Sequence, residues 1–168
     1  MDLPTLDDAV EIDDPIDLIE AVLASDDRFV AERGDDEDIS FSARGAWSEI
    51  TGFFAYRDEF PALMMTISFD LRAPKAKRTA VARLVALVNE TLWLGHFDLW
   101  SEDGSVVFRH TLPLIGREDL TAGEIQALLA AALEAGDRFY PAFNFLIWAD
   151  KSPEEALAAS MFETAGEA

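Results

Sequence analysis

WSEITGFFAYRDEFPALMMTISFDL, residues 47–71, is the stretch that decides the fold. It predicts two strands, over 47–56 and 62–71, joined by a loop at residues 58–61. In the second strand every other side chain is apolar, so one face carries Leu63, Met65, Ile67 and Phe69. A loop this short connects strands that run in opposite directions, and the stretch therefore predicts an antiparallel hairpin.

A helix and two shorter strands precede this hairpin. Asp14 followed by Pro15 is typical of a helix start, and apolar residues at helical spacing predict a helix over 15–25. A short strand is expected at 28–32. Alternating apolar and polar residues predict another strand at 39–44.

A second helix and a second hairpin follow. Pro74 opens a helical pattern that we expect to end at Gly95. Strands are expected at 96–101 and 105–112, joined by a tight two-residue turn at Asp103-Gly104. That register places Asp98 opposite Arg109, His110 opposite Phe97, and the apolar side chains of both strands on one face.

Two helices close the chain. Thr121 and Glu124 form a capping-box pattern, and Ser152-Pro153 begins a further helix. We expect Pro141 to kink the helix that contains it, or to end it. The element order is α-β-β-β-(β)-α-β-β-α-α without β-α-β alternation, which predicts an α+β fold with helices packed against an antiparallel sheet.

Charge is distributed unevenly along the 168 residues. The net charge is −20, and the first 40 residues hold 15 acidic side chains against two arginines. Such a charge repels phosphate backbones and excludes autonomous nucleic-acid binding. We expect an acidic tail at 1–14, one domain at 15–163 and a short tail at 164–168. The chain shows no signal peptide or membrane-spanning stretch, so we expect a cytoplasmic protein without a membrane partner.

Motifs for chemistry are absent from the sequence. There is no cysteine, phosphate loop, nucleophile elbow or HExxH motif. The two histidines, His96 and His110, are expected on opposite faces of their hairpin, where they cannot share a metal. We therefore expect no catalytic residue, no cofactor and no metal.

Two segments stand out as a candidate interaction surface. A basic cluster near the second helix is either its solvated start or a docking point for the acidic tail or an acidic partner. Residues 139–148 are almost wholly apolar, and such a helix is buried in the core or contributes to a homodimer. From these segments we select Arg72, Lys75, Lys77, Arg78, Phe139, Tyr140, Phe143 and Trp148.

The segment LVNETLWLGHFDLW at residues 87–100 resembles the YbjN family of bacterial sensory transduction regulators. Further matching stretches are VFRH at 107–110, DRFYPAF at 137–143 and SPEEAL at 152–157. The resemblance implies a fold similar to type III secretion chaperones, in the order helix, three strands, helix, two strands, helix. It also implies non-enzymatic binding of partner segments, and it supplies no catalytic residues.

Two functions follow as hypotheses. The first is a non-enzymatic protein-interaction module, regulatory or chaperone-like, that forms a homodimer and binds protein partners. The alternative is a small-molecule-binding or enzymatic domain. Its pocket would lie between the sheet and the helices, near Trp47, Tyr56, Trp93 and Trp100.

Overall fold

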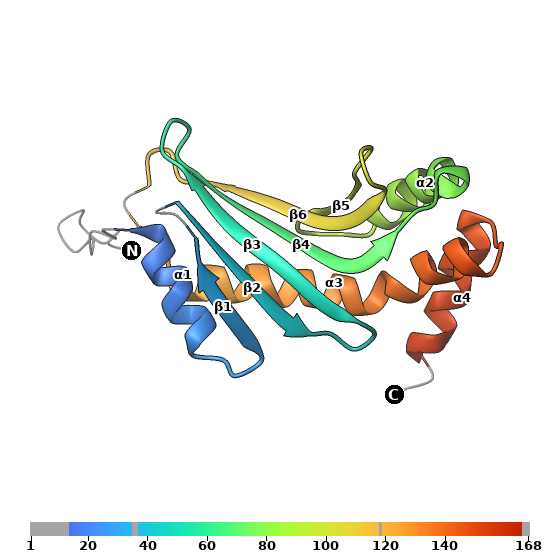
Figure 1. Cartoon of the computed structure of the whole chain (residues 1–168), viewed down its shortest axis with the longest axis horizontal. Helices are drawn as coiled ribbons and strands as arrows, with labels where there is room; N and C mark the ends of the chain where they lie inside the picture. The colour runs from blue at the N-terminus through green and yellow to red at the C-terminus, as the bar shows by residue number, and fades with distance from the viewer. Residues whose placement is uncertain (1–13, 35–36, 118, 166–168) are drawn as a thin grey trace, which may run out of the picture.

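The described residues, 14–34, 37–117 and 119–165 of a computed structural model, contain one six-stranded sheet (Figure 1). The strand order is β1-β2-β3-β4-β6-β5, and every neighbouring pair is antiparallel. The strands are β1 (Phe29–Arg33), β2 (Asp38–Arg44), β3 (Glu49–Arg57), β4 (Ala62–Arg72), β5 (His96–Leu99) and β6 (Ser105–Pro113). The α+β prediction is confirmed. The predicted order allowed three or four strands before the second helix, and four are present.

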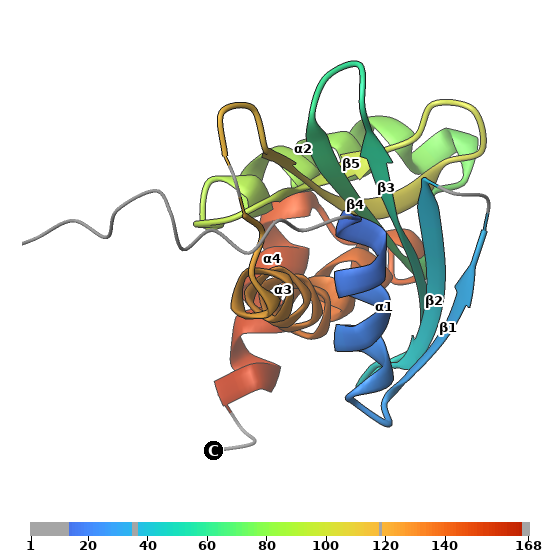
Figure 2. The ribbon, with the colours of Figure 1, turned by 90° about the vertical axis from the view of Figure 1, so that its left-hand side faces the viewer.

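Four helices and a 3₁₀ turn complete the structure. They are α1 (Pro15–Ala24), η2 (Lys75–Lys77), α2 (Arg78–Asn89), α3 (Ala122–Trp148) and α4 (Pro153–Ala165). Helices α1 and α3 pack against one face of the curved sheet, and α4 packs against α3 and α2 (Figures 1 and 2). The opposite face of the sheet carries no helix in the described part of the chain (Figure 2). The element order that the resemblance implies is present, with β1 and α4 added.

Helix starts follow the local sequence closely. The Asp14 carboxylate accepts the backbone N–H of Ile16 at 2.8 Å, which caps α1. Thr121 and Glu124 form the predicted capping box at the start of α3. Ser152 and Glu155 exchange the same pair of bonds before α4.

Phe97 lies at the centre of the core. Its ring contacts four other phenylalanines, with centroid distances of 5.2 Å to Phe143, 5.5 Å to Phe108, 5.9 Å to Phe69 and 6.2 Å to Phe139. These rings come from β4, β5, β6 and α3, so one aromatic cluster joins three strands to the long helix.

The predicted end of the second helix at Gly95 is wrong. Helix α2 ends at Asn89, whose side-chain amide pairs with both backbone groups of Phe97, at 2.8 Å to its N–H and 3.1 Å to its carbonyl. Gly95 does adopt a positive φ of 69°, but it does so immediately before β5. A side chain there would collide with the Phe108 ring. Glycine is therefore needed for the strand entry rather than for a helix cap.

The register of the second hairpin is two residues from the predicted one. Phe97 pairs with Phe108 and Asp98 with Val107, and residues 100–104 form the loop. The Asp103 carboxylate accepts the N–H and hydroxyl of Ser105, and the Ala73 N–H donates to the Gly104 carbonyl at 2.7 Å, so the longer loop is held by its own side chains and by the residue that follows β4. A two-residue shift keeps every side chain on its predicted face. Asp98 consequently still reaches Arg109, diagonally, at 3.0 Å.

Pro141 does not end its helix, because α3 continues to Trp148. A proline cannot donate to the carbonyl four residues earlier, which here belongs to Asp137. The indole N–H of Trp47 donates to that carbonyl instead, at 2.8 Å. A side chain from the β2–β3 turn thus supplies the hydrogen bond that the proline removes.

Candidate interaction surfaces

The predicted basic cluster is largely occupied by contacts within the chain. Arg72 lies 3.8 Å from Asp103, Lys77 pairs with Asp150, and Arg78 donates to the Ser101 carbonyl at 2.6 Å. Lys75 is exposed and has no ion pair within the described ranges. The cluster therefore ties η2 and α2 to the β5–β6 loop and to the α3–α4 connection, which leaves little positive charge for a partner.

The apolar stretch of α3 is divided between core and surface. Phe139 and Phe143 are fully buried in the cluster around Phe97, so they offer nothing to a second molecule. Tyr140 is half-buried, whereas the Trp148 side chain at the end of the helix is 77% exposed. Of the four residues selected from this stretch, Tyr140 and Trp148 are the two that remain at the surface.

The four aromatic residues of the alternative hypothesis do not converge on one pocket. Tyr56 lines a groove beside the β3–β4 loop, Trp47 lies at the β2–β3 turn, and Trp93 lies beside α3. Trp100 follows β5 and is 41% exposed. The space between sheet and helices is filled by the core side chains.

Titratable groups show no metal-binding arrangement in the described ranges, where no three His, Asp or Glu side chains gather in a way that could hold an ion. His96 and His110 lie on opposite faces of β5 and β6, as predicted. Burial, with the neighbouring charge of His96, lowers the pKa of His110. Among the described helices, none has both the length and the apolar character needed to cross a bilayer.

Strand β1 forms an edge of the sheet, because no described strand pairs with its second side. The Gly34 N–H donates to the Asp38 carbonyl at 3.2 Å, which fixes the direction of the backbone groups along the strand. The backbone groups of successive residues in a strand point in alternating directions. The N–H and carbonyl groups of Val30 and Glu32 therefore point toward β2, while those of Ala31 and Arg33 point outward. The Val30 side chain lies on the open face of the sheet and is 71% exposed.

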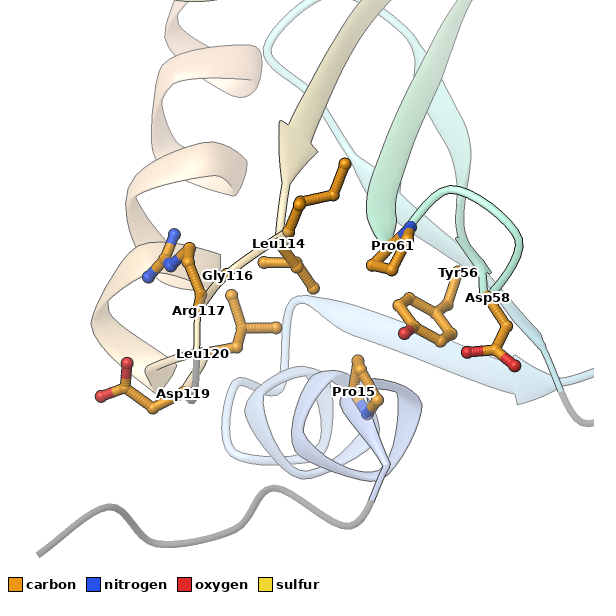
Figure 3. Close-up of a pocket in the computed structure, with 10 residues that line it drawn as sticks. Pro15, Tyr56, Asp58, Pro61, Leu114, Gly116, Arg117, Asp119 and Leu120 are labelled. Carbon is orange, nitrogen blue, oxygen red and sulfur yellow. The ribbon is translucent and has the colours of Figure 1, made fainter. Parts of the chain in front are cut away.

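A second surface lies at the end of the sheet near the start of α1. We call it the end groove, a hollow of about 490 Å³ lined by Pro15, Tyr56, Asp58, Pro61, Leu114, Ile115, Gly116, Arg117, Asp119 and Leu120 (Figure 3). Pro15 begins α1, residues 56–61 belong to the β3–β4 hairpin, and residues 114–117, 119 and 120 lie between β6 and α3. The Leu114 N–H donates to the Pro61 carbonyl at 2.7 Å, which holds two of these segments together.

The charges of the end groove are unbalanced. Arg117 points toward α3 (Figure 3), where it pairs with Glu124 at 2.6 Å. Burial alone would raise the pKa of Glu124, but hydrogen bonds from Arg117 and Thr121 outweigh burial and lower it. Asp58 and Asp119 lie on opposite sides of the groove (Figure 3) and have no ion pair within the described part of the chain.

The sequence alone did not predict the end groove. Its residues come from the start of α1, from the β3–β4 hairpin and from the connection between β6 and α3, which share no motif and meet only in the folded chain. One signal was present, namely large apolar residues within otherwise polar loops. Phe60, beside the groove residue Pro61, is 75% exposed, and Ile115 is 71% exposed.

In the part of the chain that the structure describes, these features define an α+β protein whose sheet is covered by helices on one face and carries none on the other (Figure 2). The chain belongs to the YbjN family, since residues 15–145, from the start of α1 into α3, match the family model described as "Putative bacterial sensory transduction regulator". Among solved structures, it is similar to one titled "Crystal Structure of the ExsC-ExsE Complex", with 14% sequence identity and a TM-score of 0.40 over 75% of this chain and 93% of that chain. No curated protein matches the sequence.

Proposed function

We propose that residues 15–163 form a non-enzymatic protein-interaction module that acts in the cytoplasm and binds an extended segment of a partner protein as an added strand on β1. The observation that carries this proposal is the outward direction of the Ala31 and Arg33 backbone groups at an edge with no described strand beside it. An extended peptide satisfies such groups by forming a ladder with them.

The side chains of β1 leave this edge accessible. Edge strands are usually guarded by charged side chains, above all lysine, by proline or by a bulge. Phe29–Arg33 contains no lysine or proline and pairs with β2 in an unbroken register, and its charged residues are Glu32 and Arg33. The Arg33 guanidinium forms ion pairs with Asp14, Asp17 and Glu20, so its positive charge is neutralised by the acidic residues of α1 and its N-cap. Val30 adds an exposed apolar side chain that a partner strand can cover.

Net charge favours basic partners. Because its net charge is −20 over 168 residues, the chain attracts positively charged segments and accelerates their association at low salt. Membership of a family described as a regulator of sensory transduction agrees with a binding role. The alternative pocket between sheet and helices lacks support because its four aromatic residues lie apart.

We further propose that the module forms a homodimer. Of the apolar stretch assigned to this role, Trp148 provides the largest exposed surface, with 77% of its side chain accessible. Exposed tryptophans of this kind are common at the centres of protein interfaces.

A low-salt pull-down with the full chain tests the strand addition. The wild-type bait should retain a protein identified by mass spectrometry, and Ala31→Pro should lose it because proline removes an outward N–H that β2 does not use. Val30→Thr keeps every backbone donor and should retain the partner. Recovery of no protein by the wild type, or equal recovery by Ala31→Pro, would contradict the proposal.

A further inference from the structure

We propose that the end groove binds a segment of a partner protein in which a Lys or Arg side chain adjoins an apolar side chain. This site is separate from β1, so it goes beyond the strand addition proposed above. It shares with that proposal only the assumption that the ligand is a protein segment.

The floor of the groove supplies the apolar half of the recognition. Tyr56, Pro61, Leu114 and Leu120 face one another across the hollow (Figure 3). Its volume of about 490 Å³ lies in the range of ordinary ligand sites and accommodates a few side chains. Two highly exposed apolar residues extend the surface, Ile115 within the lining and Phe60 next to Pro61.

The groove is held in shape before any ligand arrives. The Leu114 N–H bonds to the Pro61 carbonyl, and the Arg117 N–H bonds to the Leu114 carbonyl at 3.0 Å, so residues 114–117 form a turn that is held against the β3–β4 loop. The ion pair between Arg117 and Glu124 fastens this turn to α3. A preformed site loses less conformational freedom on binding.

Charge supplies the other half of the recognition. Asp58 and Asp119 lie on opposite sides of the groove and are unpaired within the described ranges. The nearby cations are already engaged, Arg117 by Glu124 and Arg57 by Glu37 at 3.7 Å. A Lys or Arg side chain of a ligand would therefore meet carboxylates without displacing a cation.

Other occupants fit this charge poorly. Residues 1–13, which lead into Pro15, contain five acidic residues and no basic one, so the two aspartates would repel them. A second copy of the chain has 33 acidic against 13 basic residues and offers few cations to the two aspartates, and the homodimer proposed above forms through Trp148, at the other end of α3 from this groove. A basic segment of another protein is the occupant that agrees with both the charge and the apolar floor.

Fluorescence anisotropy with defined peptides tests the inference. The probe is a short labelled peptide that alternates Lys and Leu, compared with peptides in which Glu replaces Lys or Ser replaces Leu. The Lys/Leu peptide should bind best, and binding should weaken with added salt. Combining Asp58→Asn with Asp119→Asn should weaken binding about 3- to 10-fold, the range expected for two partly exposed charge pairs.

A charge-matched variant provides the control. Glu90→Gln with Glu102→Gln removes the same charge from the other end of the sheet, near α2 and the β5–β6 loop, and should leave binding nearly unchanged. Equal weakening by both double variants, or no preference for Leu over Ser, would show general attraction to an acidic surface and overturn the inference.

Methyl and amide NMR with the same probe separates the two proposals. Signals of Leu114, Ile115 and Leu120 should shift if the peptide lies in the end groove. Shifts confined to Val30 and Ala31 would overturn the end groove as the site while supporting strand addition on β1. Absence of binding by the Lys/Leu peptide would overturn the end groove without bearing on a partner recovered through β1.

Discussion

Trp47 donates its indole N–H to the backbone carbonyl of Asp137 at 2.8 Å, and this is the carbonyl that Pro141 leaves without its helical donor. The adjacent Ala46 N–H donates to the Asp137 carboxylate at 3.0 Å. The β2–β3 turn is therefore fastened to α3 at the position where the helix would otherwise be weakest.

This relationship predicts an energetic coupling between Trp47 and Pro141. Trp47→Phe should lower the free energy of unfolding by about 0.5–1.5 kcal/mol, because it leaves the Asp137 carbonyl without its donor. In a Pro141→Ala background the new N–H takes that carbonyl. The same Trp47 substitution should then cost less, by roughly 0.5 kcal/mol or more.

Urea unfolding of the four proteins in this cycle measures the coupling. The cycle cancels the lost packing of the indole, which is common to both backgrounds. Additive effects of the two substitutions would contradict the account of how α3 passes through a proline.

Replacement of Gly136 in the middle of α3 is predicted to lower the stability of the protein. A Cβ at this position would collide with the Phe69 ring, so Gly136→Ala should destabilise the protein by about 1–3 kcal/mol. Gly123→Ala, in the first turn of the same helix, is the matched control, since the nearest atom to its Cβ is 4.0 Å away. Because alanine favours helices, that control should be neutral or stabilising. Thermal unfolding that ranks the two variants in the opposite order would refute the packing of α3 on β4.

Local sequence was sufficient for the elements whose cause is local. Asp14 before Pro15, Thr121 with Glu124 and the alternation in β4 each act within a few residues, and each prediction is confirmed. The faces of β5 and β6 were also predicted correctly, because a side-chain pattern of period two survives a register error of two residues.

Features decided by distant contacts were not predictable in the same way. Gly95 is required because the Phe108 ring leaves no room for a side chain, and the β5–β6 loop is held by a hydrogen bond from Ala73. Helix α3 continues past Pro141 because Trp47 supplies the missing hydrogen bond. The end groove has the same origin, since its walls come from the start of α1, the β3–β4 hairpin and the connection between β6 and α3. The candidate surface from the sequence contained Phe139 and Phe143, whose burial depends on Phe97 in another strand.

His110 is predicted to make stability depend on pH. Burial lowers its pKa from the ordinary value of 6.5, so as the pH falls below that value the unfolded chain takes up a proton more readily than the folded one. Stability should therefore decline from about pH 7.5 to pH 5.5, and His110→Gln should decline less. Urea unfolding at several pH values measures this difference. Parallel curves for the two proteins would contradict the burial of this imidazole.

Trp148 is predicted to support the homodimer. Sedimentation equilibrium at micromolar concentration should give the wild type about twice the chain mass of 18.6 kDa. Trp148→Ser should shift the protein toward the monomer. Trp93→Ser removes a side chain that is equally exposed, at 79%, and should leave the dimer intact. A wild-type mass near 18.6 kDa would contradict the dimer.

Amide hydrogen exchange along β1 tests the central claim most directly. In the free chain the amides of Val30 and Glu32 should exchange slowly because they bond to β2, and those of Ala31 and Arg33 should exchange quickly because they point outward. Addition of the partner recovered in the pull-down should slow exchange at Ala31 and Arg33 specifically. If the partner binds while these two amides continue to exchange as fast as before, the segment does not add to β1 and the proposed function is wrong.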